Sequence, residues 1–200
     1  MTKDFISYDI VRNNALKLAH KIATDGFIPD VIYASLRGGA YIGNVISEYF
    51  KLIRKNERPA FYAAVVARSY TDIRQQGKIR VDGWTYSPDH LRHGDKVLLV
   101  DDIFDSGKTV NFLAEVILDR GVPRDDLKIA VHDYKEILYK DEKPEIIPDY
   151  YCRKHVIPSA EKEIWIHYMS HELVGLTHDE IEKNYTDPEV REILKSLVKG

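Results

Sequence analysis

The chain has 200 residues, enough for one ordinary domain or one domain with a small addition. Its 29 lysine and arginine residues against 32 aspartate and glutamate residues give a formal net charge of −3, which excludes a broad cationic surface for nucleic acid or anionic membranes. Hydrophobic residues make up 44% and charged residues 30%, as in folded globular proteins rather than disordered chains.

Cysteine use and hydropathy indicate the compartment. Cys152 is the single cysteine, so no internal disulfide can form and a reducing environment is expected. The first residues lack the apolar stretch of a signal peptide. No apolar run approaches the roughly 18 residues that a membrane-spanning helix needs. We therefore expect a cytoplasmic protein with no membrane and no nucleic-acid partner.

Strands and helices alternate through the first two thirds of the chain. Apolar residues at helical spacing predict helices over residues 8–24, 40–55 and 108–120. Short β-branched or apolar runs predict strands over residues 30–34, 61–70, 96–100 and 127–131. This alternation is typical of an α/β fold with a mostly parallel central sheet flanked by helices.

The alternation ends after Tyr134. Prolines interrupt the following stretch, in which residues 150–157 and 163–168 are strand candidates. Because no clear helical pattern separates them, we expect a small covering element, or hood, mainly over residues 136–172, rather than another strand–helix unit.

The C-terminal residues have helical signals of their own. Thr177 and Glu180 form a capping-box pattern, and Asp187–Pro188 is a typical start of a helix. We therefore predict one domain over residues 1–175 and a C-terminal helical extension over 176–200.

The most informative segment is Val97–Thr109, with the sequence VLLVDDIFDSGKT. Ligands of open α/β sheets bind beyond the carboxyl ends of the strands, where this segment carries Asp101, Asp102 and Asp105. Backbone N–H groups of the following turn, residues 106–109, can surround a phosphate at a helix N-terminus. The carboxylates instead suit ribose hydroxyl groups or Mg²⁺.

This segment has two other interpretations. It ends like a P-loop in Gly107, Lys108 and Thr109, but that motif requires a glycine where this chain has Asp102. An acidic strand end that is merely solvated is the second alternative. Adjacent carboxylates at the end of so apolar a strand favour a ligand site.

The segment resembles the phosphoribosyl-diphosphate signature of the type I phosphoribosyltransferases. Members of that family that act on 6-oxopurines carry aspartate at the position of Asp105, as this chain does. The resemblance implies that Asp105 exchanges a proton with N7 of the purine, and that Asp101 and Asp102 hold the ribose hydroxyls and, with Glu172, Mg²⁺. It also implies that the 5′-phosphate is bound by Ser106, Gly107, Lys108 and Thr109.

Two earlier segments match the same family in order. One resembles its pyrophosphate loop, in which the peptide after the leucine can be cis, and comprises Leu36, Arg37, Gly38 and Gly39. Arg37 adds positive charge where a pyrophosphate would leave, although a plain strand-to-helix turn also explains this stretch. Ser69 and Tyr70 open the polar stretch 71–89, which resembles the family's lid; an exposed hairpin tip is the alternative.

Three residues resemble the family's base-binding groups. Lys135 matches a lysine aimed at O6 of the base, and as a donor it favours a carbonyl over the amino group of adenine. Trp165 would stack on the base, and the main chain near Ile166 would contact its edge. Taken alone, Lys135 is better explained as a solvated surface lysine, and Trp165 as a core residue.

The resemblance spans about residues 30–172 and implies a Mg²⁺-dependent purine salvage phosphoribosyltransferase. Such an enzyme transfers the 5-phosphoribosyl group of phosphoribosyl diphosphate to N9 of hypoxanthine or guanine, with xanthine a further candidate, and forms a nucleoside monophosphate and pyrophosphate. A homo-oligomer, dimer or tetramer, is expected. The alternatives are a non-catalytic phosphoribosyl-diphosphate or nucleotide-binding regulator of the same fold and a transferase for another nucleobase.

Overall fold

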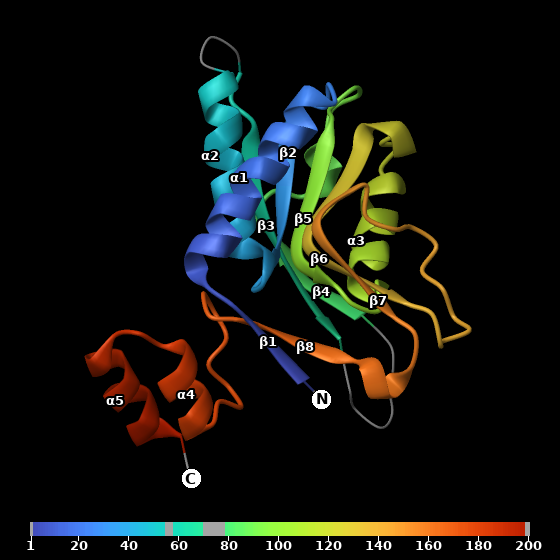
Figure 1. Ribbon diagram of the computed structural model, residues 1–200. Helices are drawn as coiled ribbons and strands as arrows, with labels where there is room; N and C mark the ends of the chain where they lie inside the picture. The colour runs from blue at the N-terminus through green and yellow to red at the C-terminus, as the bar shows by residue number, and fades with distance from the viewer. Residues whose placement is uncertain (1, 55–57, 70–78, 199–200) are drawn as a thin grey trace. The chain divides into compact units, whose positions relative to one another are not determined.

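The computed structural model describes residues 2–54, 58–69 and 79–198 (Figure 1). It divides into two compact units. The large unit comprises residues 9–163, and the small unit comprises residues 1–8 together with 164–200. Among the described residues, no helix has the length and apolar character needed to cross a membrane.

A six-stranded sheet forms the centre of the large unit, in the order β4-β3-β2-β5-β6-β7. All neighbouring strands are parallel except β3 and β4, which are antiparallel. The strands are β2 (Val31–Leu36), β3 (Phe61–Ser69), β4 (Ile79–Trp84), β5 (Val97–Phe104), β6 (Leu127–Ile137) and β7 (Tyr150–Ile157). The predicted α/β fold with a mostly parallel sheet is confirmed.

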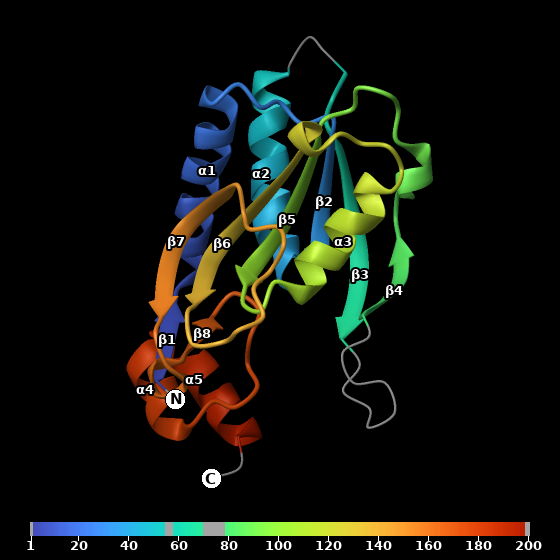
Figure 2. The same ribbon diagram turned by 90° about the vertical axis from the view of Figure 1, so that its right-hand side faces the viewer.

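Helices cover both faces of this sheet. Figures 1 and 2 show α1 (Tyr8–Thr24) and α2 (Gly39–Ile53) on one face and α3 (Lys108–Leu118) on the other. In the described part of the chain, single turns of 3-10 helix lie at Pro88–His90, Arg124–Asp126 and Ala160–Lys162. The apolar stripe of α3 is buried against the central strands, and β5 is apolar up to its acidic end, as expected for a strand that is covered on both faces.

The sheet differs from the sequence prediction in two strands. Residues 150–157 were expected in the covering element, but they form β7, the edge strand that pairs in parallel with β6. Residues 79–84, expected within the polar lid segment, form β4, which pairs with β3 at the other edge. Both edge strands contain exposed residues, whereas the central strand β2 contains none.

In the small unit, two short parallel strands and two helices are brought together. The strands are β1 (Thr2–Ile6) and β8 (Ile164–Tyr168), and the helices are α4 (His178–Asn184) and α5 (Pro188–Leu197). The predicted capping box of Thr177 and Glu180 is confirmed at the start of α4. The expected boundary at residue 175 lies inside this unit, and as a functional division it stays a prediction.

Candidate active site

The carboxyl end of β5 carries two adjacent acids, Asp101 and Asp102, which are still part of the strand. The backbone N–H of Asp102 donates to Oδ1 of Asp101 over 2.9 Å, and that of Ile103 donates to Oδ1 of Asp102 over 2.8 Å. Burial, and then the neighbouring Asp102 charge, raise the pKa of Asp101 well above its usual value, whereas a hydrogen bond with Ser35 acts in the opposite direction. A cation or a hydroxyl donor at this position would relieve the repulsion between the two acids.

The turn after β5 leads directly into α3. Gly107 has a φ of 76°, in the left-handed region, and a Cβ there would lie 2.9 Å from Cε1 of Phe104. The N-terminal N–H groups of α3, which lack helical acceptors, follow this glycine. A cavity of about 210 Å³ is lined by the whole stretch 101–110, which includes all four residues predicted to bind the 5′-phosphate. The turn therefore has the shape and the donors of an anion site.

The predicted pyrophosphate loop lies beside these acids, because β2 pairs with β5. Leu36 ends β2, the peptide between Leu36 and Arg37 is cis, and Gly39 begins α2. A Cβ on Gly38 would overlap the carboxylate of Asp102. The loop backbone thus packs directly against the acidic strand end, and a side chain at position 38 has no room.

Gly39 provides a test of this close approach. A Cβ at this position would lie 2.6 Å from the backbone oxygen of Val100, in a central strand that cannot easily move. Gly39→Ala is expected to lower the free energy of unfolding by about 1–3 kcal/mol, as overpacking typically does. Gly83→Ala, where nothing lies within 4 Å of the new Cβ, is the control in urea denaturation. Equal midpoints for the two variants would contradict the close packing.

The structure brings Asp105 and Lys135 together. Nζ of Lys135 lies 3.4 Å from Oδ1 of Asp105, with the lysine side chain 9% exposed and the aspartate side chain 57% exposed. Lys135 reaches this position because β6 continues to Ile137, beyond the predicted end of that strand. A second cavity, of about 1000 Å³, extends from this pair over α3 to residues 142–145.

The sequence of the chain matches a known protein family. The phosphoribosyl transferase domain matches residues 7–156, three quarters of the chain. The chain belongs to the phosphoribosyltransferase family. The acidic strand end, the anion-binding turn and the loop 36–39 all lie within the matched residues.

Solved structures share the type I phosphoribosyltransferase fold. The purine phosphoribosyltransferase from Pyrococcus horikoshii OT3 is 22% identical, with a TM-score of 0.64 over 86% of this chain and 95% of that one. A hypothetical protein from Neisseria gonorrhoeae with bound ppGpp is 21% identical, with a TM-score of 0.63 over 98% and 97% of the two chains. The Helicobacter pylori xanthine-guanine-hypoxanthine phosphoribosyltransferase is 17% identical, with a TM-score of 0.55 over 83% and 91%.

These identities support the fold and not a particular substrate. A search of curated proteins found no match to the chain. The choice of base therefore depends on the side chains at the candidate site of this phosphoribosyltransferase.

The remaining predicted residues lie in other parts of the chain. Trp165 is 49% exposed and Ile166 is buried, both on β8 of the small unit. Oε2 of Glu172 accepts a hydrogen bond from the backbone N–H of Tyr168 over 3.3 Å, also within the small unit. Ser69 ends β3, and Tyr70 lies outside the described residues. The roles of these residues stay predictions.

The donor set of the acidic strand end fits Mg²⁺. In the described part of the chain, no group of three or more His, Cys, Asp or Glu side chains could hold a metal by itself. Mg²⁺ usually keeps several waters and binds through one or two carboxylates plus substrate phosphates. Asp101 and Asp102 supply two such carboxylates beside the anion-binding turn.

The sequence did not predict a group of polar residues on β6 and β7 that contact one another. Asp133 is completely buried in β6 and is hydrogen-bonded to His132, Arg153 and His155. Arg153 and His155 lie on β7, which was assigned to the covering element and not to the central sheet, so their proximity to Asp133 was not foreseen. The sequence signal is weak, because Asp133 is one of several polar residues in the strand LKIAVHDYKEI, and its need for partners follows from its complete burial.

Proposed function

We propose that this phosphoribosyltransferase uses Mg²⁺ to transfer the 5-phosphoribosyl group of phosphoribosyl diphosphate to N9 of hypoxanthine or guanine. The observation that carries the proposal is the 3.4 Å approach of Lys135 to Asp105 at the shared end of β5 and β6. A carboxylate and an ammonium group side by side match the two polar positions of a 6-oxopurine, N7–H and O6. Xanthine has the same two positions and is a further candidate.

The reaction forms a bond between N9 and C1′ and breaks the bond from C1′ to the pyrophosphate oxygen. Asp105 accepts the proton from N7 as N9 attacks, and Lys135 donates a hydrogen bond to O6. Lys135 disfavours adenine, since the amino group at its C6 cannot accept a hydrogen bond from an ammonium.

The other groups bind and orient the phosphoribosyl part. Asp101 and Asp102 accept hydrogen bonds from the ribose hydroxyls, and N–H groups of residues 106–109 hold the 5′-phosphate. Residues 36–39 bind the pyrophosphate, where Arg37 adds positive charge. Asp101 and Asp102 would hold Mg²⁺, which would supply charge stabilisation to the leaving group.

Residues of the small unit and the lid complete the proposal. Trp165 stacks on the base, the main chain at Ile166 contacts its edge, and Glu172 adds a third acid near the metal or the base. Ser69 and Tyr70 open a lid that shields the reacting carbon from water. We further propose that the enzyme works in the cytoplasm as a dimer or tetramer.

The experiment is a set of initial rates with phosphoribosyl diphosphate and Mg²⁺, using hypoxanthine, guanine, xanthine and adenine separately. We expect turnover of an oxopurine and at least tenfold less turnover of adenine, the discrimination expected from one unpaired hydrogen-bonding group. Adenine as the best base would overturn the role given to Lys135. A chelator should abolish the rate, and full activity without divalent metal would contradict the role given to the two acids.

A second candidate is a non-catalytic regulator that binds a nucleotide in the same place. The structurally similar Neisseria gonorrhoeae protein contains bound ppGpp, which supports this alternative. An anion-binding turn beside two acids would suit a phosphorylated nucleoside without any transfer. Binding of phosphoribosyl diphosphate or ppGpp with no turnover of any base would favour the regulator.

A further inference from the structure

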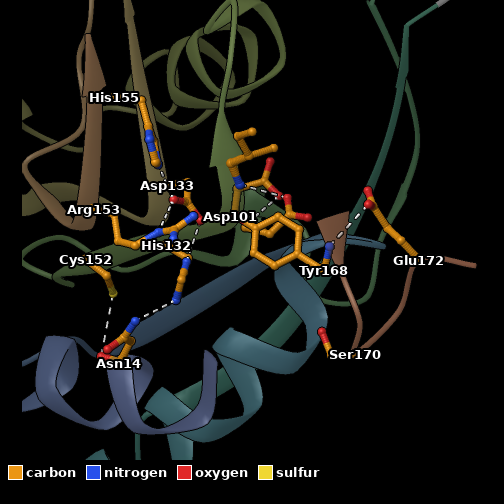
Figure 3. Close-up of polar contacts among 12 residues, drawn as sticks. Asn14, Asp101, His132, Asp133, Cys152, Arg153, His155, Tyr168, Ser170 and Glu172 are labelled. Atoms are coloured by element: carbon orange, nitrogen blue, oxygen red, sulfur yellow. Dashed lines mark hydrogen bonds and ion pairs between the residues drawn. The ribbon is translucent and has the colours of Figure 1, made fainter. Parts of the chain in front are cut away.

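A polar cluster centred on the buried residues His132 and Asp133 lies in the large unit (Figure 3). Asp133 is completely buried, and each contact from His132 Nδ1, Arg153 Nε and His155 Nε2 to its carboxylate measures 2.6 Å. The amide of Asn14, on α1, lies 3.1 Å from Nε2 of His132. We call these five residues the Asp133 cluster.

The hydrogen bonds define the proton positions in the cluster. If the Asn14 amide donates to Nε2 of His132, then Nδ1 of His132 carries the hydrogen and donates to Asp133. Arg153 supplies the positive charge that offsets the buried carboxylate. Donors of three residues therefore converge on the Asp133 carboxylate, and the cluster links α1, β6 and β7.

Stability alone is a weak reason for such a cluster. Asp133 is completely buried, and its charged partner Arg153 is 29% exposed. A buried ion pair often contributes no more than well-packed apolar residues of the same volume would. Buried polar groups contribute more clearly to a unique arrangement, because any shift leaves donors without acceptors. The position of the cluster in the sheet is therefore the informative observation.

Asp133 lies next to the predicted catalytic machinery in the strand register. It pairs with Ile103 of β5, between the acids at 101 and 102 and Asp105. Lys135 follows two residues later on β6, on the same side of the strand, and pairs with His155 of β7. The hydrogen bond between His155 and Asp133 thus runs diagonally, from the residue opposite Lys135 to the residue two positions before it.

We infer that Asp133 is a positioning residue that locks β6 to β7 and so holds Lys135 against Asp105, where it can contact O6 of the base. This inference rests on the proposed function for the identity of the ligand. In this inference the Asp133 cluster affects recognition of the base only through the position of Lys135, and does not contact the base. Its physical basis is that a register or rotation error in β6 would turn the Lys135 side chain away from the site.

The chain offers a matched control at the other end of the same strand pair. Oδ2 of Asp149, just before β7, accepts a hydrogen bond from the backbone N–H of Ile129 over 2.8 Å. Its carboxylate also lies 3.3 Å from Arg124 and 3.5 Å from Lys128. Asp149 therefore joins β6 to β7 as Asp133 does, but at the end of the strands remote from Lys135.

The test compares Asp133→Asn with Asp149→Asn in the full chain. Calorimetry measures the Kd of inosine monophosphate, which carries a 6-oxopurine, and of phosphoribosyl diphosphate, which carries no base. Asp133→Asn is expected to weaken inosine monophosphate about tenfold, as loss of one charge-assisted hydrogen bond does, without changing the Kd of phosphoribosyl diphosphate. Asp149→Asn should change neither Kd, although both variants lower Tm.

A double-variant cycle shows whether Asp133 acts through the lysine. Lys135→Gln alone should weaken inosine monophosphate, and adding Asp133→Asn should weaken it no further. A purely structural role would instead lower both affinities together, or add fully to the Lys135→Gln effect. Either result would overturn the inference, as would an unchanged Kd in Asp133→Asn.

A milder variant covers the case in which Asp133→Asn does not fold. His155→Gln removes one donor at the edge of the cluster, and it should weaken inosine monophosphate in the same selective way. The outcomes also separate this inference from the proposed function. Wild-type turnover tests the function, whereas nucleotide affinity tests the role of Asp133 whether or not any base reacts. Wild-type protein that binds neither ligand would overturn both.

Discussion

Replacing Asp105 by asparagine is expected to slow the transfer to hypoxanthine or guanine by about 10²–10⁴-fold, the usual contribution of a general base. Asparagine has nearly the same shape as aspartate but cannot accept the N7 proton at neutral pH. The Asp105 side chain is mostly exposed, so its replacement should leave the fold intact. The loss should appear in kcat, because the phosphoribosyl diphosphate contacts involve other residues.

The control for this variant is Asp119→Asn, at an exposed aspartate at the C-terminal end of α3. It should retain the wild-type rate in the same assay. A KM for phosphoribosyl diphosphate within about twofold of wild type in Asp105→Asn would show that the ribose and phosphate sites are intact. A kcat that falls less than tenfold would remove Asp105 from the proton transfer.

Local patterns were enough to predict most of the large unit. The helix predicted over residues 8–24 matches α1, because Val11, Ala15, Leu18 and Ile22 repeat at helical spacing and are all buried. The strand predicted at 96–100 is the apolar core of β5, but the observed strand continues to Phe104. Acidic residues at a strand end look like the start of a loop when pairing with the neighbouring strand cannot be seen.

The errors share a physical cause, which is pairing between distant residues. Parallel strands are normally joined by a helical crossover, and the 12 residues between β6 and β7 have none, so β7 was assigned to the hood. β1 was missed because it begins with polar residues and pairs only with β8, at the far end of the chain. Sequence patterns describe a strand's own faces and not its partner.

The candidate site was predictable where the residues are contiguous. The stretch 101–109 and the loop 36–39 each follow a buried strand, and those strands are neighbours in the sheet. The Asp133 cluster was not predictable, because it combines residues of α1, β6 and β7 that have no sequence signature of their own. The approach of Lys135 to Asp105 likewise depends on the unpredicted length of β6.

Asp101→Asn is expected to stabilise the protein and to inactivate it. Burial and the adjacent Asp102 raise the pKa of Asp101, so the charged carboxylate is unfavourable in the folded protein at neutral pH. Asparagine retains an oxygen for the backbone N–H of Asp102 and removes the repulsion between the two acids. A gain of 1 kcal/mol would raise Tm by about 2–4 °C in a chain of this size.

The pH dependence follows from the direction of that pKa shift. Because the folded pKa lies above the unfolded value, stability associated with Asp101 is fully present below the unfolded pKa, about 3.9, and is lost as pH rises through the folded pKa. The advantage of Asp101→Asn over wild type should therefore be largest near neutral pH and should shrink as pH falls toward 4. Urea denaturation in metal-free buffer measures both free energies of unfolding.

Activity should move in the opposite direction from stability. Loss of one carboxylate that holds the ribose and Mg²⁺ is expected to lower kcat/KM about 100-fold or more, since charge-assisted contacts of this kind are worth about 1.5–3 kcal/mol each. A variant that is less stable than wild type at neutral pH would show that Asp101 is compensated in the folded protein. A variant that is more stable and inactive would mean that this acidic pair is maintained for ligand binding at the expense of stability.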